Sequence, residues 1–158
     1  MPSQSPNTQS LIDSIDPLEL TAAAPPLTAW QLGLVDSADA VAALLSHGGP
    51  VSAQGGVQHG LAEQDTRPDP SYWTAIKAQM HIFLCTDDER YRELWRRIDA
   101  LENKTTGTLV GLIATALGAS IGVAATLVAG FVAVSLYAVI KLGKEAYCVY
   151  AAPAPAAA

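Results

Sequence analysis

The sequence predicts an all-α membrane protein. Hydrophobic residues make up 50% of its 158 residues and charged residues only 15%, whereas globular proteins average about 25% charged residues. The run from Thr105 to Ile140 contains 36 residues without a charge or a proline, and a helix needs only about 20 apolar residues to cross a bilayer core. In the segments before this run, apolar residues recur at the three- and four-residue steps of amphipathic helices.

The charges divide the chain into three parts. Residues 1–70 carry eight acidic groups and one basic group, residues 71–104 carry six of each, and residues 105–158 carry two lysines and one glutamate. The net charge of −6 argues against nucleic acid as a partner, because phosphate binding requires a positive surface. Three compositions this different indicate three physical roles.

Residues 1–70 are expected to be a largely disordered acidic region, because eight prolines and two glycine pairs interrupt it. One exception is a predicted amphipathic helix over residues 27–46, where apolar residues follow helical spacing. Another is the string of apolar and acidic residues from Leu11 to Leu20. This string is interpreted either as a docking motif for a protein partner or as a solvated tail.

Residues 71–104 are predicted to form a cytoplasmic helical stem, either a hairpin or a coiled-coil-like unit. Thr86 and Glu89 fit a capping box that begins its second helix. The apolar stripe that follows is too short for an independent coiled coil, so we expect it to pack on residues 71–84 or on copies of itself. Its packing residues are Tyr91, Leu94, Trp95, Ile98 and Leu101.

Residues 105–141 form the predicted membrane segment, as one long or two short transmembrane helices. One straight helix of 36 residues would extend about 54 Å at 1.5 Å per residue, more than one span needs and slightly less than two. Small residues recur along the segment at spacings of 4, 7, 4, 7 and 4, which brings them to one face of a continuous helix. They are Gly107, Gly111, Gly118, Gly122, Ala129 and Ala133. Because small faces let helices associate closely in lipid, the stripe predicts a homo-oligomer.

Two observations on the topology of this segment point in opposite directions. An unbroken stripe favours one long helix, since a turn between Gly118 and Gly122 would divide it. Basic residues on both sides of the segment favour a hairpin with both ends in the cytoplasm. These membrane-flanking charges are Arg96, Arg97, Lys104, Lys141 and Lys144. Either arrangement predicts an integral protein of an inner or plasma membrane with residues 1–104 in the cytoplasm.

Residues 142–158 are predicted to be a juxtamembrane segment with a low-complexity tail. Tyr147 and Tyr150 suit the aromatic belt of a membrane interface. Cys148, between them, is interpreted as a reduced thiol or as an acylation site. Two cysteines are too few for a disulfide framework, and this fits a reducing compartment.

No motif in the sequence predicts catalysis. A phosphate-binding loop, a nucleophile elbow and a zinc-protease motif are all missing. His81 and Cys85 have a four-residue spacing that suits a metal, but two ligands are too few for a structural zinc site. We therefore expect no catalytic, cofactor-binding or metal-binding residues and no enzymatic activity.

Three functions fit these observations. The first is a small, self-associating, membrane-permeabilising effector with a cytoplasmic regulatory region, an architecture analogous to toxin-like, holin-like and cell-suicide proteins. The second is a non-catalytic membrane anchor or scaffold that recruits a protein partner through the acidic residues 1–70. The third is a soluble helical subunit whose apolar hairpin is buried by another protein. In the first two, the lipid bilayer is a partner.

Overall fold

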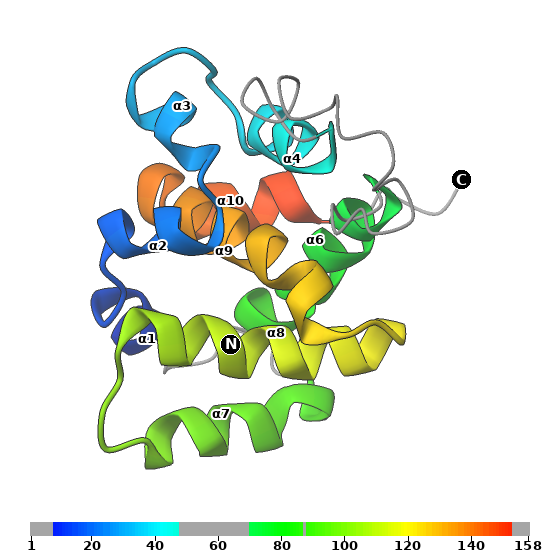
Figure 1. Ribbon diagram of the computed structural model, residues 1–158. Coiled ribbons are helices and arrows are strands. Elements are labelled where there is room, and N and C mark those ends of the chain that lie inside the picture. Colours follow the sequence, from blue (N-terminus) through cyan, green and yellow to red (C-terminus); the bar gives the residue numbers. More distant parts are fainter. Residues whose placement is uncertain (1–7, 48–69, 87, 153–158) are drawn as a thin grey trace.

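The computed structural model describes residues 8–47, 70–86 and 88–152 (Figure 1). Within these ranges it contains nine α-helices, one short 3₁₀ helix and no strand, so the all-α prediction is confirmed for the part of the chain described. The helices are α1 (Thr8–Asp13), α2 (Pro17–Ala23), α3 (Leu27–Gln31), α4 (Ala38–His47), α6 (Pro70–Cys85), η2 (Glu89–Tyr91), α7 (Arg92–Ala100), α8 (Thr106–Ile121), α9 (Ala125–Leu142) and α10 (Lys144–Ala151).

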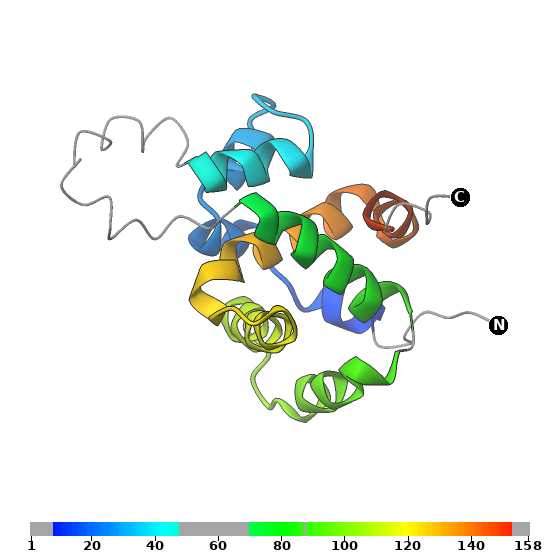
Figure 2. The same ribbon diagram turned by 90° about the vertical axis from the view of Figure 1, so that its right-hand side faces the viewer.

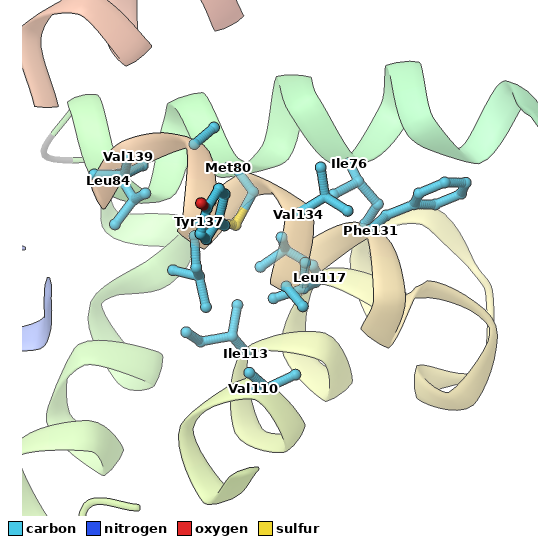
Figure 3. Close-up of a cluster of buried hydrophobic side chains, with 14 of the residues drawn as sticks. Ile76, Met80, Leu84, Val110, Ile113, Leu117, Phe131, Val134, Tyr137 and Val139 are labelled. Atoms are coloured by element: carbon cyan, nitrogen blue, oxygen red, sulfur yellow. The ribbon is translucent and has the colours of Figure 1, made fainter. Parts of the chain in front are cut away.

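Helix α9 lies at the centre of the molecule. Every residue from Phe131 to Val139 is buried, because α2, α4, α6, α8 and α10 all pack against this helix. Figure 3 shows its side chains meeting those of α6 and α8 in one apolar cluster. A helix that is hydrophobic on all sides must be enclosed by protein or by lipid, and here other helices of the same chain enclose α9.

A tight turn separates α8 from α9. Helix α8 ends at Gly122, whose φ of 80° is left-handed, and the Val123 amide donates to the Gly118 carbonyl at 2.8 Å, as in a Schellman motif. The chain runs out along α8 and returns along α9 (Figure 1). Of the two arrangements left open for residues 105–141, one long helix is therefore wrong and two helices are present; that they cross a membrane stays a prediction. We call α8 and α9 together the apolar helix pair.

The N-terminal region contains more ordered structure than its composition predicts. Four short helices occupy residues 8–47, whereas residues 1–7 and 48–69 lie outside the described residues. The expected disorder is thus corrected for residues 8–47. The prolines initiate helices there: Pro17 is the first residue of α2, after the N-cap residue Asp16. The predicted helix over residues 27–46 is divided into α3 and α4 at a turn that contains Gly33, with a φ of 82°.

Buried contacts attach these N-terminal helices to the rest of the molecule. The Thr8 hydroxyl donates to the Leu84 carbonyl at 3.3 Å, and the Asp16 amide donates to Thr106 Oγ1 at 2.8 Å. Gly130 of α9 allows a close approach, because a Cβ there would lie 3.2 Å from the Ala23 carbonyl oxygen of α2. The first helices therefore form part of the cover around α9.

The predicted stem folds back onto its own molecule. Phe83 of α6 stacks on Trp95 with ring centroids 4.5 Å apart and meets Tyr91 edge-on at 5.7 Å. Tyr91, Leu94, Trp95 and Ile98 are buried and Leu101 is half-buried. Asp88, whose carboxylate accepts from the Arg90 amide, caps the 3₁₀ turn in place of the expected Thr86. Figure 2 shows α7 lying below α8 and α6.

Replacing Gly118 with alanine is expected to lower the free energy of unfolding by about 1–3 kcal/mol, because the new Cβ would lie 2.5 Å from the Val123 carbonyl oxygen. The matched control, Gly111→Ala, has no atom within 4 Å of the new Cβ. It should leave stability unchanged or raise it by about 1 kcal/mol through helix propensity. Thermal unfolding followed by circular dichroism measures both variants, and equal stabilities would contradict this turn.

Candidate functional site: the apolar helix pair and the contacts that enclose it

The structure distributes the six small residues over several environments. Gly107 and Gly111 are exposed on α8, with open space beyond them. Gly118 is buried against the turn, and Gly122 forms its left-handed residue. On α9, Ala129 is half-buried and Ala133 is buried. The six residues do not share one face because the helix is interrupted; Gly122 is exposed in the turn, and Gly107 and Gly111 form the one exposed pair on a helix. Self-association through them stays a prediction.

Helix α8 has a solvent-facing side without charges. Its inner side is buried through Leu109, Ile113 and Leu117. Its outer side consists of small or weakly polar exposed residues, of which the last three face the cleft towards α7: Gly107, Thr108, Gly111, Thr115, Ala119 and Ser120. By contrast, the exposed residues of α7 include three arginines, a glutamate and an aspartate. The outer side of α8 is therefore compatible with water, with lipid or with another helix.

Helix α9 is the one helix of the described residues that is long and apolar enough to cross a membrane. It has 18 residues with a mean hydropathy of 2.0, and 56% of this span is buried inside the molecule. Helix α8, with 16 residues, is shorter. Core helices of soluble proteins share this composition, so composition alone does not assign α9 to a bilayer.

Three of the five predicted flanking charges, Lys104, Lys141 and Lys144, lie near the ends of the helix pair, and the other two lie on α7. Arg96 and Arg97 pair with Glu93 at 3.3 and 3.6 Å on the exposed surface of α7. Lys104 donates to the Leu101 carbonyl at 3.0 Å just before α8. Lys141 is exposed in the last turn of α9, and partial burial lowers the pKa of Lys144 at the start of α10. Lys104 and Lys141 thus lie at the first and last turns of the pair.

A polar cluster that the sequence did not reveal joins three of the enclosing helices. Asp39 Oδ1 of α4 accepts hydrogen bonds from Trp73 Nε1 at 2.7 Å and Lys77 Nζ at 3.2 Å, both on α6. It also accepts one from the Tyr150 hydroxyl of α10 at 2.7 Å. The Lys77 ammonium lies over the rings of Trp73 and Tyr150, 5.5 and 5.1 Å from their centroids. We call Asp39, Trp73, Lys77 and Tyr150 the Asp39 cluster.

The cluster perturbs the acid–base behaviour of its own members. Partial burial raises the pKa of Asp39, but the hydrogen bonds from Trp73, Tyr150 and Lys77 outweigh it, so the pKa lies below the usual 3.8. Burial, followed by the hydrogen bond to Asp39, raises the pKa of Tyr150. The cluster therefore contains a carboxylate and a neutral phenol at neutral pH.

A disulfide joins Cys85, at the end of α6, to Cys148 of α10. Their Cα atoms are 5.8 Å apart although 63 residues separate them in sequence. The interpretation of Cys148 as a free thiol or an acylation site is thus corrected. The sequence contained no signal for this pairing, because two isolated cysteines acquire a common location only through the packing of α10 on α6. Disulfides persist in oxidising compartments, so the reasoning that favoured a reducing compartment no longer holds.

Helix α10 also places a large polar side chain in the core. Tyr147 is fully buried, and its burial raises the pKa of its hydroxyl. That hydroxyl lies near the buried Ser135 hydroxyl of α9, but neither group has a well-aligned hydrogen bond. Unpaired buried polar groups destabilise a packed state by about 1–3 kcal/mol each.

A cleft of about 260 Å³ separates η2 and α7 from α8. Two arginines on its rim, Arg90 and Arg97, already pair with Asp88 and Glu93. The Tyr91 hydroxyl reaches Gln79 and Ser120. These polar groups at the cleft are thus paired with other groups of the protein, and the cleft has no set of groups directed at a ligand. Among the described residues, no three His, Cys, Asp or Glu side chains are close enough to hold a metal ion.

No protein-family model, curated protein or solved structure matches this chain. The fold and its contacts define the molecule by its architecture: an all-α protein in which amphipathic helices enclose a charge-free helix pair. Both cysteines and the Asp39 cluster fix the last of the enclosing helices, α10.

Replacing Asp39 with asparagine is expected to lower the melting temperature at neutral pH, by an amount equivalent to about 1 kcal/mol, because the charge facing Lys77 is lost. The folded-state pKa of Asp39 lies below its unfolded value. The charged carboxylate therefore stabilises the fold fully above the unfolded pKa, and this stabilisation is lost as the pH falls through the folded pKa. The difference between wild type and variant should therefore shrink in acid. Thermal unfolding across pH measures it, and a difference that grows below about pH 4 would contradict this assignment.

Proposed function

We propose that this protein is a membrane-permeabilising effector that keeps its membrane-inserting helices enclosed until it meets a bilayer. The observation that carries the proposal is the chemistry of the apolar helix pair. It has no charge from Thr105 to Ile140, not even on the outer side of α8, which faces water in this structure. Surface helices of soluble proteins normally carry charged residues on that side.

The dimensions of the pair suit a bilayer. Helix α9 has 18 residues and α8 has 16, or about 27 and 24 Å at 1.5 Å per residue, against a hydrocarbon core of about 30 Å. Helices satisfy their own backbone hydrogen bonds in lipid. If the pair inserts as a hairpin, Lys104 and Lys141 remain on the same side, as the basic flanks predict.

Self-association supplies the step from insertion to permeabilisation. Gly107 and Gly111 form a small, exposed face on α8 with open space beyond it. In lipid such a face allows two helices to pack closely. We therefore propose that inserted pairs contact each other through this face, while α9 contributes lipid-facing surface. Of the six residues in the predicted stripe, this proposal assigns helix–helix association to Gly107 and Gly111.

The anchor function receives less support from the structure. It assigned partner binding to the acidic residues 1–70, and the docking motif considered within them, Leu11 to Leu20, has Leu11, Ile15 and Leu20 buried within the same molecule. A partner would have to displace α1 and α2 before it could bind them. We therefore favour the effector over the anchor.

The soluble-subunit function is the second candidate, and a specific observation favours its soluble part but not burial of the hairpin by another protein. More than half of the α9 span is buried by helices of its own chain, so the pair is covered without another protein. Exposure to vesicles discriminates the two candidates, since a permanently soluble helical protein leaves them intact.

The disulfide bears on where the protein acts. It favours folding in an oxidising compartment, whereas the sequence predicted that residues 1–104 lie in the cytoplasm. We propose that the enclosed form faces an oxidising space and approaches the membrane from that side.

Replacing Gly111 with glutamate should reduce dye release from vesicles of phosphatidylcholine and phosphatidylglycerol by about tenfold or more, because a charge at membrane depth costs about 2.5–3.5 kcal/mol. The site is exposed with open space around it, so the enclosed fold should tolerate the change. Thr28→Glu, at an exposed site in the first turn of α3, changes the net charge equally and should leak like wild type.

Circular dichroism and thermal unfolding of both variants establish that the fold is intact. If wild-type protein releases no dye, or if the two glutamate variants release it equally, the apolar pair does not act by insertion. The soluble-subunit function would then replace the effector.

A further inference from the structure

Helix α10 follows the central helix after a single residue. Gly143 is the only residue between Leu142 of α9 and Lys144 of α10. Its φ of 93° and ψ of 153° lie in a region that only glycine adopts readily. One glycine therefore sets the direction of α10, and a rotation there moves the whole helix relative to α9.

Helix α10 covers part of the apolar interior. It packs on α6 and α9 and buries its own residues Tyr147 and Ala151 there, whereas its Val149 is exposed. Figure 2 shows α10 against the end of α9, on the side away from α7. Removing it would expose Tyr147 and the region of α9 around Ser135.

Helix α10 is held by apolar burial of Tyr147 and Ala151 and by polar contacts that are modest. Tyr150 donates to Asp39 at 2.7 Å, but the Asp39 side chain is 55% exposed, and exposed charge contacts contribute little stability. The buried hydroxyls of Tyr147 and Ser135, which lie near each other without a well-aligned hydrogen bond, act in the opposite direction, because both would gain water if α10 moved away. The disulfide from Cys148 to Cys85 adds the one covalent attachment of α10 to another described helix.

We propose that the Cys85–Cys148 disulfide is a redox switch whose reduction releases α10 from α6 and α9. The proposal rests on the proposed function, because the surface that α10 covers belongs to the membrane-inserting pair. Reduction uncovers that surface and makes insertion easier. A protein that crosses from an oxidising space to a reducing dithiol at a membrane would open in this way.

The chemical step is dithiol exchange with an external dithiol reductant. One thiolate of the reductant attacks Cys148 Sγ, because Cys148 is half-buried whereas Cys85 is 7% exposed. The sulfur–sulfur bond breaks, and Cys85 leaves as a thiolate that takes up a proton. The second thiolate of the reductant then attacks the mixed disulfide and releases Cys148. The reductant becomes a disulfide, and the protein gains two electrons and two protons.

Hydrogen exchange of the full chain, with and without dithiothreitol and without vesicles, tests the release of α10. We expect the amides of α10 to exchange at least about tenfold faster after reduction, while those of α7 change little. The Cys85→Ser, Cys148→Ser variant should behave like the reduced protein. Unchanged exchange in α10, or equal acceleration in every helix, would show a structural cross-link instead of a switch.

Two variants of α10 that each lose one hydroxyl provide a sharper test. In reduced protein, Tyr147→Phe removes an unpaired buried hydroxyl and should slow exchange in α10. Tyr150→Phe removes the hydrogen bond to Asp39 and should accelerate it. Shifts in the same direction would contradict the balance of contacts described above.

Dye release from vesicles, measured with oxidised and reduced protein, distinguishes failure of this proposal from failure of the proposed function. If reduction both releases α10 and increases leakage, both proposals stand. If α10 is released but the reduced protein leaves vesicles intact, the proposed function fails while the switch remains. If leakage is strong but independent of reduction, the switch is refuted as a control of insertion.

Discussion

The burial of α9 is the constraint on which the rest of the structure depends. Nine consecutive residues, Phe131 to Val139, are removed from water, and none of them carries a charge. Such a helix can face water on no side, so the remaining helices are arranged around it. The short helices α1 to α4 fold where their composition alone would not order them, because α9 provides the apolar surface on which they pack.

Helix α8 contributes the second half of this arrangement. Its inner side completes the cover of α9, while its outer side faces water without a charge. A pair with these properties is stable under a helical cover and also compatible with lipid, since neither environment leaves a charge unpaired. This dual compatibility links the enclosed fold to the proposed activity, and α10 with its disulfide is the part of the cover that can be controlled chemically.

The sequence predicted the features that depend on local pattern. The sequence was enough to predict the helical structure, the charge-free run and the apolar stripe from Tyr91 to Leu101, because side-chain periodicity reports directly on helix faces. The break at Gly122 was ambiguous, because several small residues around it could equally form a helix face or a turn. The Asp39 cluster and the Cys85–Cys148 disulfide could not be predicted, because they join residues 34 to 111 positions apart that only the tertiary packing brings together.

The depth of residue 111 in a bilayer tests the central claim most directly. A fluorophore on Gly111→Cys, in a chain that also carries Cys85→Ser and Cys148→Ser, can be quenched by nitroxide lipids labelled near the headgroup or along the acyl chain. Our account predicts that acyl-chain nitroxides quench it once vesicles are added, whereas a fluorophore on Thr28→Cys stays accessible to aqueous quenchers. A residue 111 that remains equally accessible to aqueous quenchers with and without vesicles would contradict the account, and the helix pair would then be the core of a soluble protein.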